Sequence, residues 1–447
     1  MSPATDETTE TTRPTASDEA VCVIGAGSSG IAAVKVLHER GIEVVCYEKG
    51  SGVGGNWRYR NDNEMSSAYA SLHINTSKEK MAYSDFPMPA EYPDYPHHSQ
   101  ILDYFEDYVD HFGFRDVIHF GTEVTAVEPT ENGRWRVSVR DSDGEHERVV
   151  RAVLVANGHH WAPRLPEFTG SFDGETMHSH FYETPEQLTG RRVLVVGIGN
   201  SAVDIACEAS RVAEETVLST RRSAHILPKY AFGRPIDHFT TPAGSRLPLW
   251  LQRLGFQLVL RIARGPQDRF GVTEPDHHLL AAHPTISADL LNLVGHGKIR
   301  MKPNLERLDG DGVVFVDGSR ETIDLVIYCT GYEIRFPFLG DDLVDPRQND
   351  VRLFRNVVHP RVPGLFFIGL VQPLGAIMPL AEAQSVWVAR LLRGEAVLPS
   401  RARMEREIER DRARIKRRYV KSDRHTIQVD FYPYLEQVQR EAARVGG

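Results

Sequence analysis

The stretch 21–30, VCVIGAGSSG, most constrains what this chain can fold into, because an apolar run of strand formers ends there abruptly in glycines. Gly25, Gly27 and Gly30 have the G-x-G-x-x-G spacing. In this motif the first glycine permits a tight turn, the second lets backbone N–H groups approach a pyrophosphate, and the third lets a helix pack closely on the strand. The stretch therefore predicts a strand, a turn and a helix whose N-terminus binds a phosphate.

The residues after this turn complete a βαβ unit. The run 31–40 has apolar positions at helical spacing, Gly41 supplies a stop, and 42–47 reads as a second strand that ends at Glu48. Glu48 follows the first glycine by roughly twenty residues, where a carboxylate can accept hydrogen bonds from ribose hydroxyls. The glycine-rich loop 50–57 would let the backbone pass close to a bulky ligand. The helix, the second strand and Glu48 together therefore support a dinucleotide site more strongly than the glycine pattern does alone.

A second glycine turn lies within 191–204, RRVLVVGIGNSAVD. Gly197 and Gly199 are in place, and Ala202 takes the third position, which the fingerprint tolerates. A strand precedes the turn, a helix follows it, and 216–219 reads as the next strand. The chain therefore carries the same nucleotide-binding motif twice, which predicts an α/β fold.

The two units differ at the position that reads the ribose. Aligning their first glycines places Thr220 where Glu48 stands, with Arg221 and Arg222 immediately after it. The carboxylate that would repel a 2′-phosphate is missing, and two guanidinium groups that could bind one are present. The second unit is predicted to prefer NADPH over NADH, with two solvated arginines as the alternative, while the first unit suits the adenosine half of FAD.

Bulk composition excludes several classes of protein. The 447 residues carry a net charge of -9, which argues against nucleic-acid partners. The four cysteines are far apart and form no C-x-x-C pair, so they indicate core residues in a reducing compartment. No apolar run is long enough to span a bilayer, and the polar leader 1–19 reads as disordered, not as a secretory signal. The expected location is the cytoplasm.

Three further segments shape the expectations. The stretch 69–96 is dense in Pro, Tyr, Asn and Ser, which favours an irregular segment lining a site, with a plain surface excursion as the alternative. A helix is predicted over 98–112 with Ser99 as its N-cap. The insertion 235–270 contains an apolar stretch punctuated by arginines, which could rest on a membrane or a partner but is expected to pack on its own domain.

Side chains suited to catalysis are few. The chain has no G-x-S-x-G elbow and no H-E-x-x-H motif, and His178 and His180 lack further ligands nearby, so no metal site is expected. The chemistry would then belong to the flavin. A dithiol reductase would need a cysteine pair beside the flavin, and none is available, so oxygen is the favoured electron acceptor.

The motifs together resemble those of the flavin-containing monooxygenases, in particular soluble members of bacterial type, from about residue 20 to near the C-terminus. The matching segments are the first glycine turn, GGNW at 54–57, INTSKEKMAYSDFPMP at 74–89, GHHWAPRLP at 158–166, VVGIGNSAVDIA, STRR, CTGY and GLVQPLGAIMP. The segment FDGETMHSHFY also satisfies the family fingerprint F-x-G-x-x-x-H-x-x-x-Y through Phe172, Gly174, His178 and Tyr182.

The resemblance implies two Rossmann-like dinucleotide-binding domains of the three-layer FAD/NAD(P)-binding type. FAD would be held by 20–165 and 326–447, and NADPH by an inserted domain at 166–325. For FAD the resemblance and the motifs indicate Gly25, Gly27, Ser29, Gly30, Glu48, Lys49, Gly55, Trp57, Asn75, Val124 and Gln372. For NADPH they indicate Gly197, Gly199, Asn200, Ser201, Arg221, Thr330 and Gly331. Asn75 matches the asparagine that stands beside the flavin ring in this family, and is the candidate catalytic residue.

The resemblance also implies the reaction. Family members reduce FAD with NADPH, form a C4a-hydroperoxyflavin with O₂, and pass one oxygen to a soft nucleophile such as an amine or a sulfide. Baeyer–Villiger oxidation of a ketone is one alternative, although Tyr182 ends the fingerprint where that group has tryptophan. An NADPH oxidase or nucleotide-sensing flavoprotein is another. Glu183 and Asn157 depart from the usual family pattern and leave the substrate class open. A homodimer is the default oligomeric state.

Overall fold

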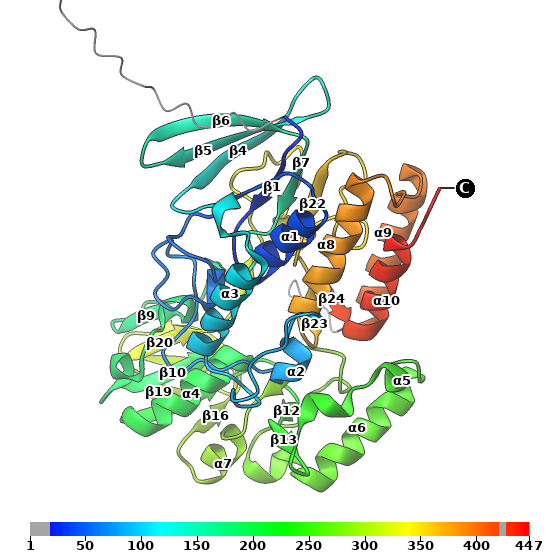
Figure 1. Cartoon of the computed structure of the whole chain (residues 1–447). Helices are drawn as coiled ribbons and strands as arrows, with labels where there is room; N and C mark the ends of the chain where they lie inside the picture. Colours follow the sequence, from blue (N-terminus) through cyan, green and yellow to red (C-terminus); the bar gives the residue numbers. More distant parts are fainter. Residues whose placement is uncertain (1–17, 420–425, 447) are drawn as a thin grey trace, which may run out of the picture.

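The computed structural model describes residues 18–419 and 426–446 and shows two units, each built on a five-stranded parallel sheet (Figure 1). The predicted leader lies outside the described residues except for Asp18 and Glu19. The predicted α/β fold with two Rossmann-like units is confirmed by this architecture. Helices and antiparallel strands cover the two faces of each sheet.

The first sheet has the strand order β22-β7-β1-β2-β3. Along the chain this is the Rossmann order, in which the first strand is central and the strand order reverses beside it. Every residue of its three central strands is buried, as expected for a parallel sheet covered on both faces. The strands are β1 (Val21–Ile24), β2 (Val44–Tyr47), β3 (Ile118–His119), β7 (Ala152–Val155) and β22 (Leu365–Phe367).

Alternate residues of β1 pack into two different cores. Val21 and Val23 belong to the cluster under the helices, whereas Cys22 and Ile24 face the antiparallel strands, where Trp135 is buried. This division follows from the period of two along a strand. The longer helices of this unit are α1 (Ser28–Glu39), α3 (His98–Phe112), α8 (Met378–Leu392), α9 (Arg401–Arg418) and α10 (Phe431–Ala442). Its antiparallel strands are β4 (Glu123–Pro129), β5 (Trp135–Asp141) and β6 (Gly144–Val150).

The second sheet repeats this plan with the order β16-β11-β10-β20-β9. In β10, Val193 and Val195 pack under the helix α4 (Asn200–Val212), while Leu194 and Val196 pack against a three-stranded antiparallel sheet. The parallel strands are β9 (Glu175–His178), β10 (Arg192–Val196), β11 (Glu215–Ser219), β16 (Arg300–Lys302) and β20 (Leu325–Tyr328). The antiparallel strands are β17 (Leu305–Asp309), β18 (Gly312–Phe315) and β19 (Arg320–Thr322).

The chain crosses between the two units twice, and the crossings lie side by side. β8 (Ala162–Pro163) on the outward path pairs with β21 (Tyr332–Glu333) on the return path. Because β20 pairs with β10 in the second sheet, the chain leaves the second unit only after Tyr328. The boundary expected between 325 and 326 therefore falls inside a strand of the second sheet.

The N-cap of α3 differs from the expectation, and two other boundaries follow from the structure. The apolar run 149–156 is two strands, β6 and β7, separated at Arg151, whose backbone N–H donates to the Ala20 carbonyl. The helix α3 is capped by His97, not Ser99, because the His97 ring accepts from the Ser99 N–H while Gln100 accepts from the His97 N–H. The helix α8 begins at Met378.

The insertion within 235–270 contains the helix α6 (Leu249–Ala263). One face of α6 packs on its own unit, as expected, through Leu260 and its neighbours in a small core. The opposite face is exposed, however, and Leu260 is the one residue of this helix that is fully buried. The expected packing on its own domain therefore describes the inner face of α6 and not the outer face.

Candidate functional site

The first glycine turn connects β1 to α1 and is shaped by backbone contacts. Gly25 has a φ of 98°, and a Cβ there would lie 2.8 Å from the Ala156 carbonyl oxygen. A Cβ on Gly30 would lie 1.8 Å from the Gly25 carbonyl oxygen. Gly27 is the N-cap of α1, and no side chain caps the helix. The N–H groups of the first turn therefore remain available to an anion.

Glu48 is buried at the end of β2 and joins the glycine turn to the next loop. Its carboxylate accepts hydrogen bonds from the backbone N–H groups of Ala26 and Gly50, each at 2.7 Å, and from Asn63 Nδ2 at 3.1 Å. A carboxylate has about four acceptor positions, so capacity remains for a ribose hydroxyl. Asn61 Oδ1 is buried nearby, against Gly50, without a hydrogen-bond partner among the described residues. These groups fit the adenosine half of FAD.

Other predicted FAD residues lie around the same turn. A Cβ on Gly55 would be 3.0 Å from the Gly27 Cα, and one on Gly369 would be 2.0 Å from Ser29 Oγ. The structure thus brings Gly25, Gly27, Ser29, Gly30, Glu48 and Gly55 together. Trp57 ends the short helix Gly55–Trp57 and packs on the core under the helices of the first unit. Gln372 is the first residue of β23 (Gln372–Leu374), which lies just before α8.

Two predicted FAD residues have other packing partners. The Lys49 ammonium forms an ion pair with Glu123 at 3.0 Å, and Val124 is buried in the core beneath β4. Both lie beside the carboxyl end of β2, because the Glu48 carbonyl accepts a hydrogen bond from the Thr122 N–H at 2.9 Å. Their contact with FAD stays a prediction, as does that of the other predicted residues.

The second glycine turn has the same construction. Gly197 has a φ of 137°, and a Cβ there would lie 2.7 Å from the Cys329 carbonyl oxygen. Gly199 is the N-cap of α4, again without a side-chain cap. Asn200 Oδ1 accepts from the Ile286 N–H at 2.9 Å, which leaves its NH₂ group free, and Ser201 is exposed. Thr330 and Gly331 follow β20, at the carboxyl end of the strand beside the turn.

Arg221 and Arg222 follow β11 and are both exposed. Neither forms an ion pair with a carboxylate in the part of the chain that the structure describes, although most arginines elsewhere do. Thr220, at the position equivalent to Glu48, donates its N–H to Lys302 at 3.1 Å and offers no negative charge. Two uncommitted guanidinium groups at the edge of the second site fit a 2′-phosphate.

Substituting Arg221 by Ala is expected to raise the KM for NADPH by on the order of tenfold and to leave the KM for NADH nearly unchanged, because charge-assisted hydrogen bonds to the 2′-phosphate are lost. Steady-state NADPH and NADH oxidation measures both constants. Arg335→Ala, which removes an exposed arginine paired with Glu333, is the control. Equal losses with the two coenzymes would remove Arg221 from the phosphate site.

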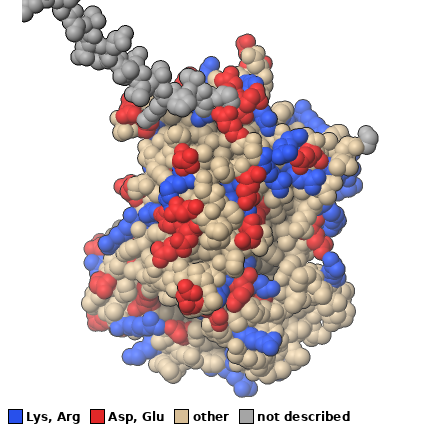
Figure 2. All heavy atoms as spheres, viewed as in Figure 1, with Lys and Arg blue, Asp and Glu red and all other residues tan. Residues whose placement is uncertain are grey.

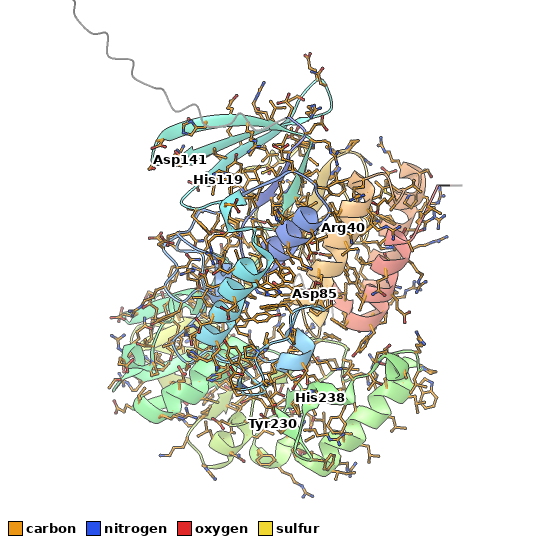
Figure 3. The ribbon with its side chains drawn as sticks, in the orientation of Figure 1. Arg40, Asp85, His119, Asp141, Tyr230 and His238 are labelled. Atoms are coloured by element: carbon orange, nitrogen blue, oxygen red, sulfur yellow. The ribbon has the colours of Figure 1, made fainter. Side chains whose placement is uncertain are left out.

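Asn75 lies on a segment held between the two units. The Ile74 N–H donates to Pro96 within the first unit, and the Ser77 N–H donates to Asp237 Oδ2 of the second unit at 2.7 Å. His238, labelled below α2 (Lys78–Met81) in Figure 3, contacts Ser77 Oγ at 3.2 Å. The half-buried Asn75 amide forms no side-chain hydrogen bond with any described residue. Both its donors and its acceptor are thus free for a ligand.

A second junction was missed by the sequence analysis. Tyr69 of the irregular segment donates to Asp204 Oδ2 at 2.5 Å, and Ser71 and Tyr182 both donate to Glu208. Asp204 and Glu208 are one turn apart on α4, so the first unit is fastened along that helix. Burial raises the pKa of Asp204 to about 6. The only sequence signal was Tyr182, the last residue of the fingerprint.

The fingerprint residues are positioning residues in this structure. A Cβ on Gly174 would meet the Asp324 carbonyl oxygen and the Phe172 ring, each at 2.6 Å. His178 Nδ1 accepts from the His180 N–H, so His178 Nε2 donates to the Gly331 carbonyl at 3.0 Å. The fingerprint therefore fixes the position of the segment after β20, which returns to the first unit, beside the second glycine turn. Glu183, next in sequence, is paired with Arg60 of the first unit at 2.9 Å.

The buried His178 predicts a pH dependence of stability. Burial lowers the pKa of His178 to about 4, so the unfolded chain binds more protons between pH 4 and the ordinary value near 6.5. Its contribution is present above about pH 6.5 and is lost as the pH falls, by about 1 kcal/mol at about pH 5.5. Denaturant unfolding at two pH values should show this loss in the parent and a smaller loss in His178→Gln; an unchanged pH dependence in the variant would contradict it.

Thiol and metal chemistry find little support among the described residues. Cys22, Cys46, Cys207 and Cys329 are free thiols, and burial raises the pKa of Cys329, beside the second turn, to about 12. A thiol of this kind is a poor nucleophile. Within the described ranges no group of three His, Cys, Asp or Glu side chains is placed to hold a metal ion.

Comparison with known proteins agrees with this geometry. The family model described as "Flavin-binding monooxygenase-like" matches residues 18–444. The chain belongs to the flavin-containing monooxygenase family. It is 41% identical to flavin-containing monooxygenase 5 of Rattus norvegicus over 94% of this chain and 81% of that protein. It is 36% identical to dimethylaniline monooxygenase [N-oxide-forming] 2 of the same species, over 94% of this chain and 82% of that protein.

Solved structures show the same fold. S-allyl-L-cysteine S-oxygenase from Allium sativum matches with a TM-score of 0.73 and 26% identity, covering 95% of this chain and 88% of that one. An open structure of cyclohexanone monooxygenase matches with a TM-score of 0.68 at 20% identity, covering 95% and 96% of the two chains, which supports the fold alone.

The family establishes the enzyme class of this flavin-containing monooxygenase. It is a flavoprotein oxidoreductase that uses FAD, NADPH and O₂, as expected from the sequence. The expected subgroup of bacterial type is not supported, since both of these relatives are mammalian proteins. Among the described residues, no helix has both the length and the apolar content needed to cross a bilayer.

Proposed function

We propose that this flavin-containing monooxygenase transfers one oxygen atom of O₂ to a soft nucleophile, the nitrogen of an amine or the sulfur of a sulfide. The observation that carries the proposal is Asn75, a free amide held between the FAD unit and the NADPH unit. Bound FAD supplies the activated oxygen. The protein must then keep the reacting groups dry and donate hydrogen bonds. This task needs an amide more than an acid or a base.

The predicted contacts assign the two nucleotides to the two glycine turns. FAD would lie on the N-terminus of α1 with its ribose at Glu48, and NADPH would lie on the N-terminus of α4 with its 2′-phosphate at Arg221. The FAD domain would comprise 20–165 and the segment after β20, and the NADPH domain the residues between them. Both strands β1 and β10 lie where the strand order of their sheet reverses, which is where such ligands bind.

The relatives favour nitrogen and sulfur over ketones. Their names include an N-oxide-forming dimethylaniline monooxygenase and an S-oxygenase of S-allyl-L-cysteine. The proteins named for cyclohexanone are 19–20% identical and share the fold only. Tyr182 also ends the fingerprint and is tied to Glu208, where the Baeyer–Villiger fingerprint has tryptophan. We therefore place Baeyer–Villiger oxidation second.

A panel of tertiary amines, sulfides and ketones tests the assignment. NADPH oxidation is followed together with product and hydrogen peroxide. The proposal predicts N-oxides or sulfoxides in near one-to-one ratio with NADPH consumed. Lactones or esters as the main product would favour the ketone alternative, and peroxide as the only product would indicate an NADPH oxidase.

Location and assembly are part of the same proposal. Four free thiols, three of them buried, suit a reducing compartment, so we infer a cytoplasmic enzyme. A homodimer is the default oligomeric state for such an enzyme. Light scattering of the FAD-loaded protein measures its mass directly.

A further inference from the structure

The segment 369–372, which we call the Gly369 loop, joins β22 to β23 and lies against the first glycine turn. Gly369 has a φ of 77°, and a Cβ there would lie 2.0 Å from Ser29 Oγ, at the start of α1. Gln372, at the other end of the loop, is itself a predicted FAD contact, as Ser29 is. The loop therefore joins two predicted FAD contacts at the carboxyl edge of the first sheet, where nucleotides bind in folds of this kind.

Two side chains behind the Gly369 loop hold its backbone. The Gly369 N–H donates to Gln384 Oε1 of α8 at 2.8 Å. Gln384 Nε2 donates to the Tyr434 hydroxyl of α10 at 2.7 Å. That hydroxyl in turn donates to the Arg355 carbonyl at 2.6 Å. Because Gln384 is 0% exposed and Tyr434 is 4% exposed, the three hydrogen bonds form one buried path from the loop to α10.

Ion pairs fix the far end of this path. The Arg355 guanidinium contacts Asp411 Oδ2 of α9 at 2.7 Å and Glu441 Oε1 of α10 at 3.2 Å. It also forms an ion pair with Glu407 of α9. Arg355 has a φ of 54°, a conformation that a residue other than glycine keeps only where its surroundings enforce it. Figure 2 shows basic and acidic side chains close together over α9 and α10. Both helices thus hold the carbonyl that accepts from Tyr434.

The segment before α10 holds the other end of the Gly369 loop. The Gln372 N–H donates to the Ile427 carbonyl at 2.9 Å, and β23 pairs in parallel with β24 (Gln428–Asp430), which leads directly into α10. In Figure 1, α8 lies between α1 and α10, and it packs on both. Residues 427–442 therefore fix the loop at both of its ends, although they are far from the first glycine turn in sequence.

We propose that Gln384 and Tyr434 are positioning residues for FAD, which act by holding the Gly369 loop against the first glycine turn. The inference rests on the proposed placement of FAD at that turn. Apolar side chains of similar size could fill this part of the core, but they would leave the buried Gly369 N–H without an acceptor. A buried path of hydrogen bonds instead selects one position of the backbone. FAD would then bind a loop that is already in place, which avoids the cost of ordering it.

FAD affinity of the apoprotein, titrated by flavin fluorescence, tests the proposal. Gln384→Met keeps the length of the side chain but removes the acceptor for the Gly369 N–H, so we expect FAD binding to weaken by about tenfold or more. Tyr434→Phe removes one hydroxyl and should weaken FAD binding by about threefold or more. Because Tyr434 acts through Gln384, the double variant should bind FAD no more weakly than Gln384→Met alone.

The matched control is Gln267→Met in the second unit. Gln267 is also 0% exposed, and it accepts from the Ile226 N–H at 3.2 Å and donates to the Ala224 carbonyl at 3.0 Å. Loss of these bonds should lower the free energy of unfolding and leave FAD affinity unchanged. An equal loss of FAD affinity in Gln267→Met, or a further loss in the double variant, would show a merely structural role and overturn the proposal.

Gly27→Ala, in the first glycine turn, separates failure of this proposal from failure of the FAD placement. If Gly27→Ala weakens FAD binding while Gln384→Met and Tyr434→Phe do not, FAD lies at the turn and the positioning role is wrong. If none of the three variants weakens FAD binding, the placement is wrong and the positioning role falls with it.

Discussion

Substitution of Asn75 by Ala is expected to leave NADPH oxidation within about twofold of the parent while product formed per NADPH falls by about tenfold or more. The reason is that Asn75 offers a hydrogen-bond donor at the junction of the two units, while its side chain forms no hydrogen bond with any described residue. Removing it should therefore spare the fold and the two glycine turns, which are predicted to hold the pyrophosphates. The measurement is the ratio of product and hydrogen peroxide to NADPH consumed.

Asn75→Asp sharpens this test, because the carboxylate keeps the size of the side chain but cannot donate when ionised. It should lose coupling as Asn75→Ala does. Asn132→Ala, which changes an exposed asparagine in the turn between β4 and β5, is the control and should behave as the parent. Full coupling in Asn75→Asp would show that Asn75 does not act as a donor, and a parallel loss of NADPH oxidation would point to a structural role.

Substitution of Gly27 by Ala is expected to weaken FAD binding by about tenfold to a hundredfold without unfolding the chain. Gly27 has a φ of -74°, which any residue adopts, and an added Cβ would meet its nearest neighbour, the Gly55 Cα, at 3.6 Å. The protein therefore has room for the methyl group. However, Gly27 is the second glycine of the G-x-G-x-x-G motif, the position where the backbone approaches the pyrophosphate.

FAD affinity of the apoprotein, titrated by flavin fluorescence, measures this effect, and circular dichroism reports the fold. Gly295→Ala is a close control, because its Cβ would also meet a neighbour, Phe270, at 3.6 Å, far from the first turn. It should bind FAD as the parent does. Retention of full affinity in Gly27→Ala would contradict the placement of FAD on the N-terminus of α1.

The parts of the fold that follow from local chemistry were predictable. Both glycine turns, the strands before them and the helices after them lie where the motifs predicted, because backbone strain at Gly25 and Gly197 and close packing at Gly30 admit no other residue type. The helix α3 was predicted over its full length from its apolar period. Glu48 lies at the end of β2 for the same local reasons.

The parts that depend on distant contacts were not predictable. Tyr69 and Asp204 are 135 residues apart, and nothing in either local pattern indicates that they meet. The strand β20 joins the second sheet because of its pairing with β10, so composition could not place the domain boundary. Similarly, the apolar stretch of α6 supplies residues to two faces, and only the three-dimensional packing shows which face the protein covers.

The fate of molecular oxygen is the most direct test of monooxygenation by this enzyme. The FAD-loaded enzyme is supplied with NADPH, isotopically labelled O₂ and a tertiary amine or sulfide that it turns over, and the label is measured in the product and in peroxide. We expect one labelled oxygen atom in the N-oxide or sulfoxide for each NADPH oxidised. Label recovered only as hydrogen peroxide, or an oxidised product whose oxygen comes from water, would contradict it.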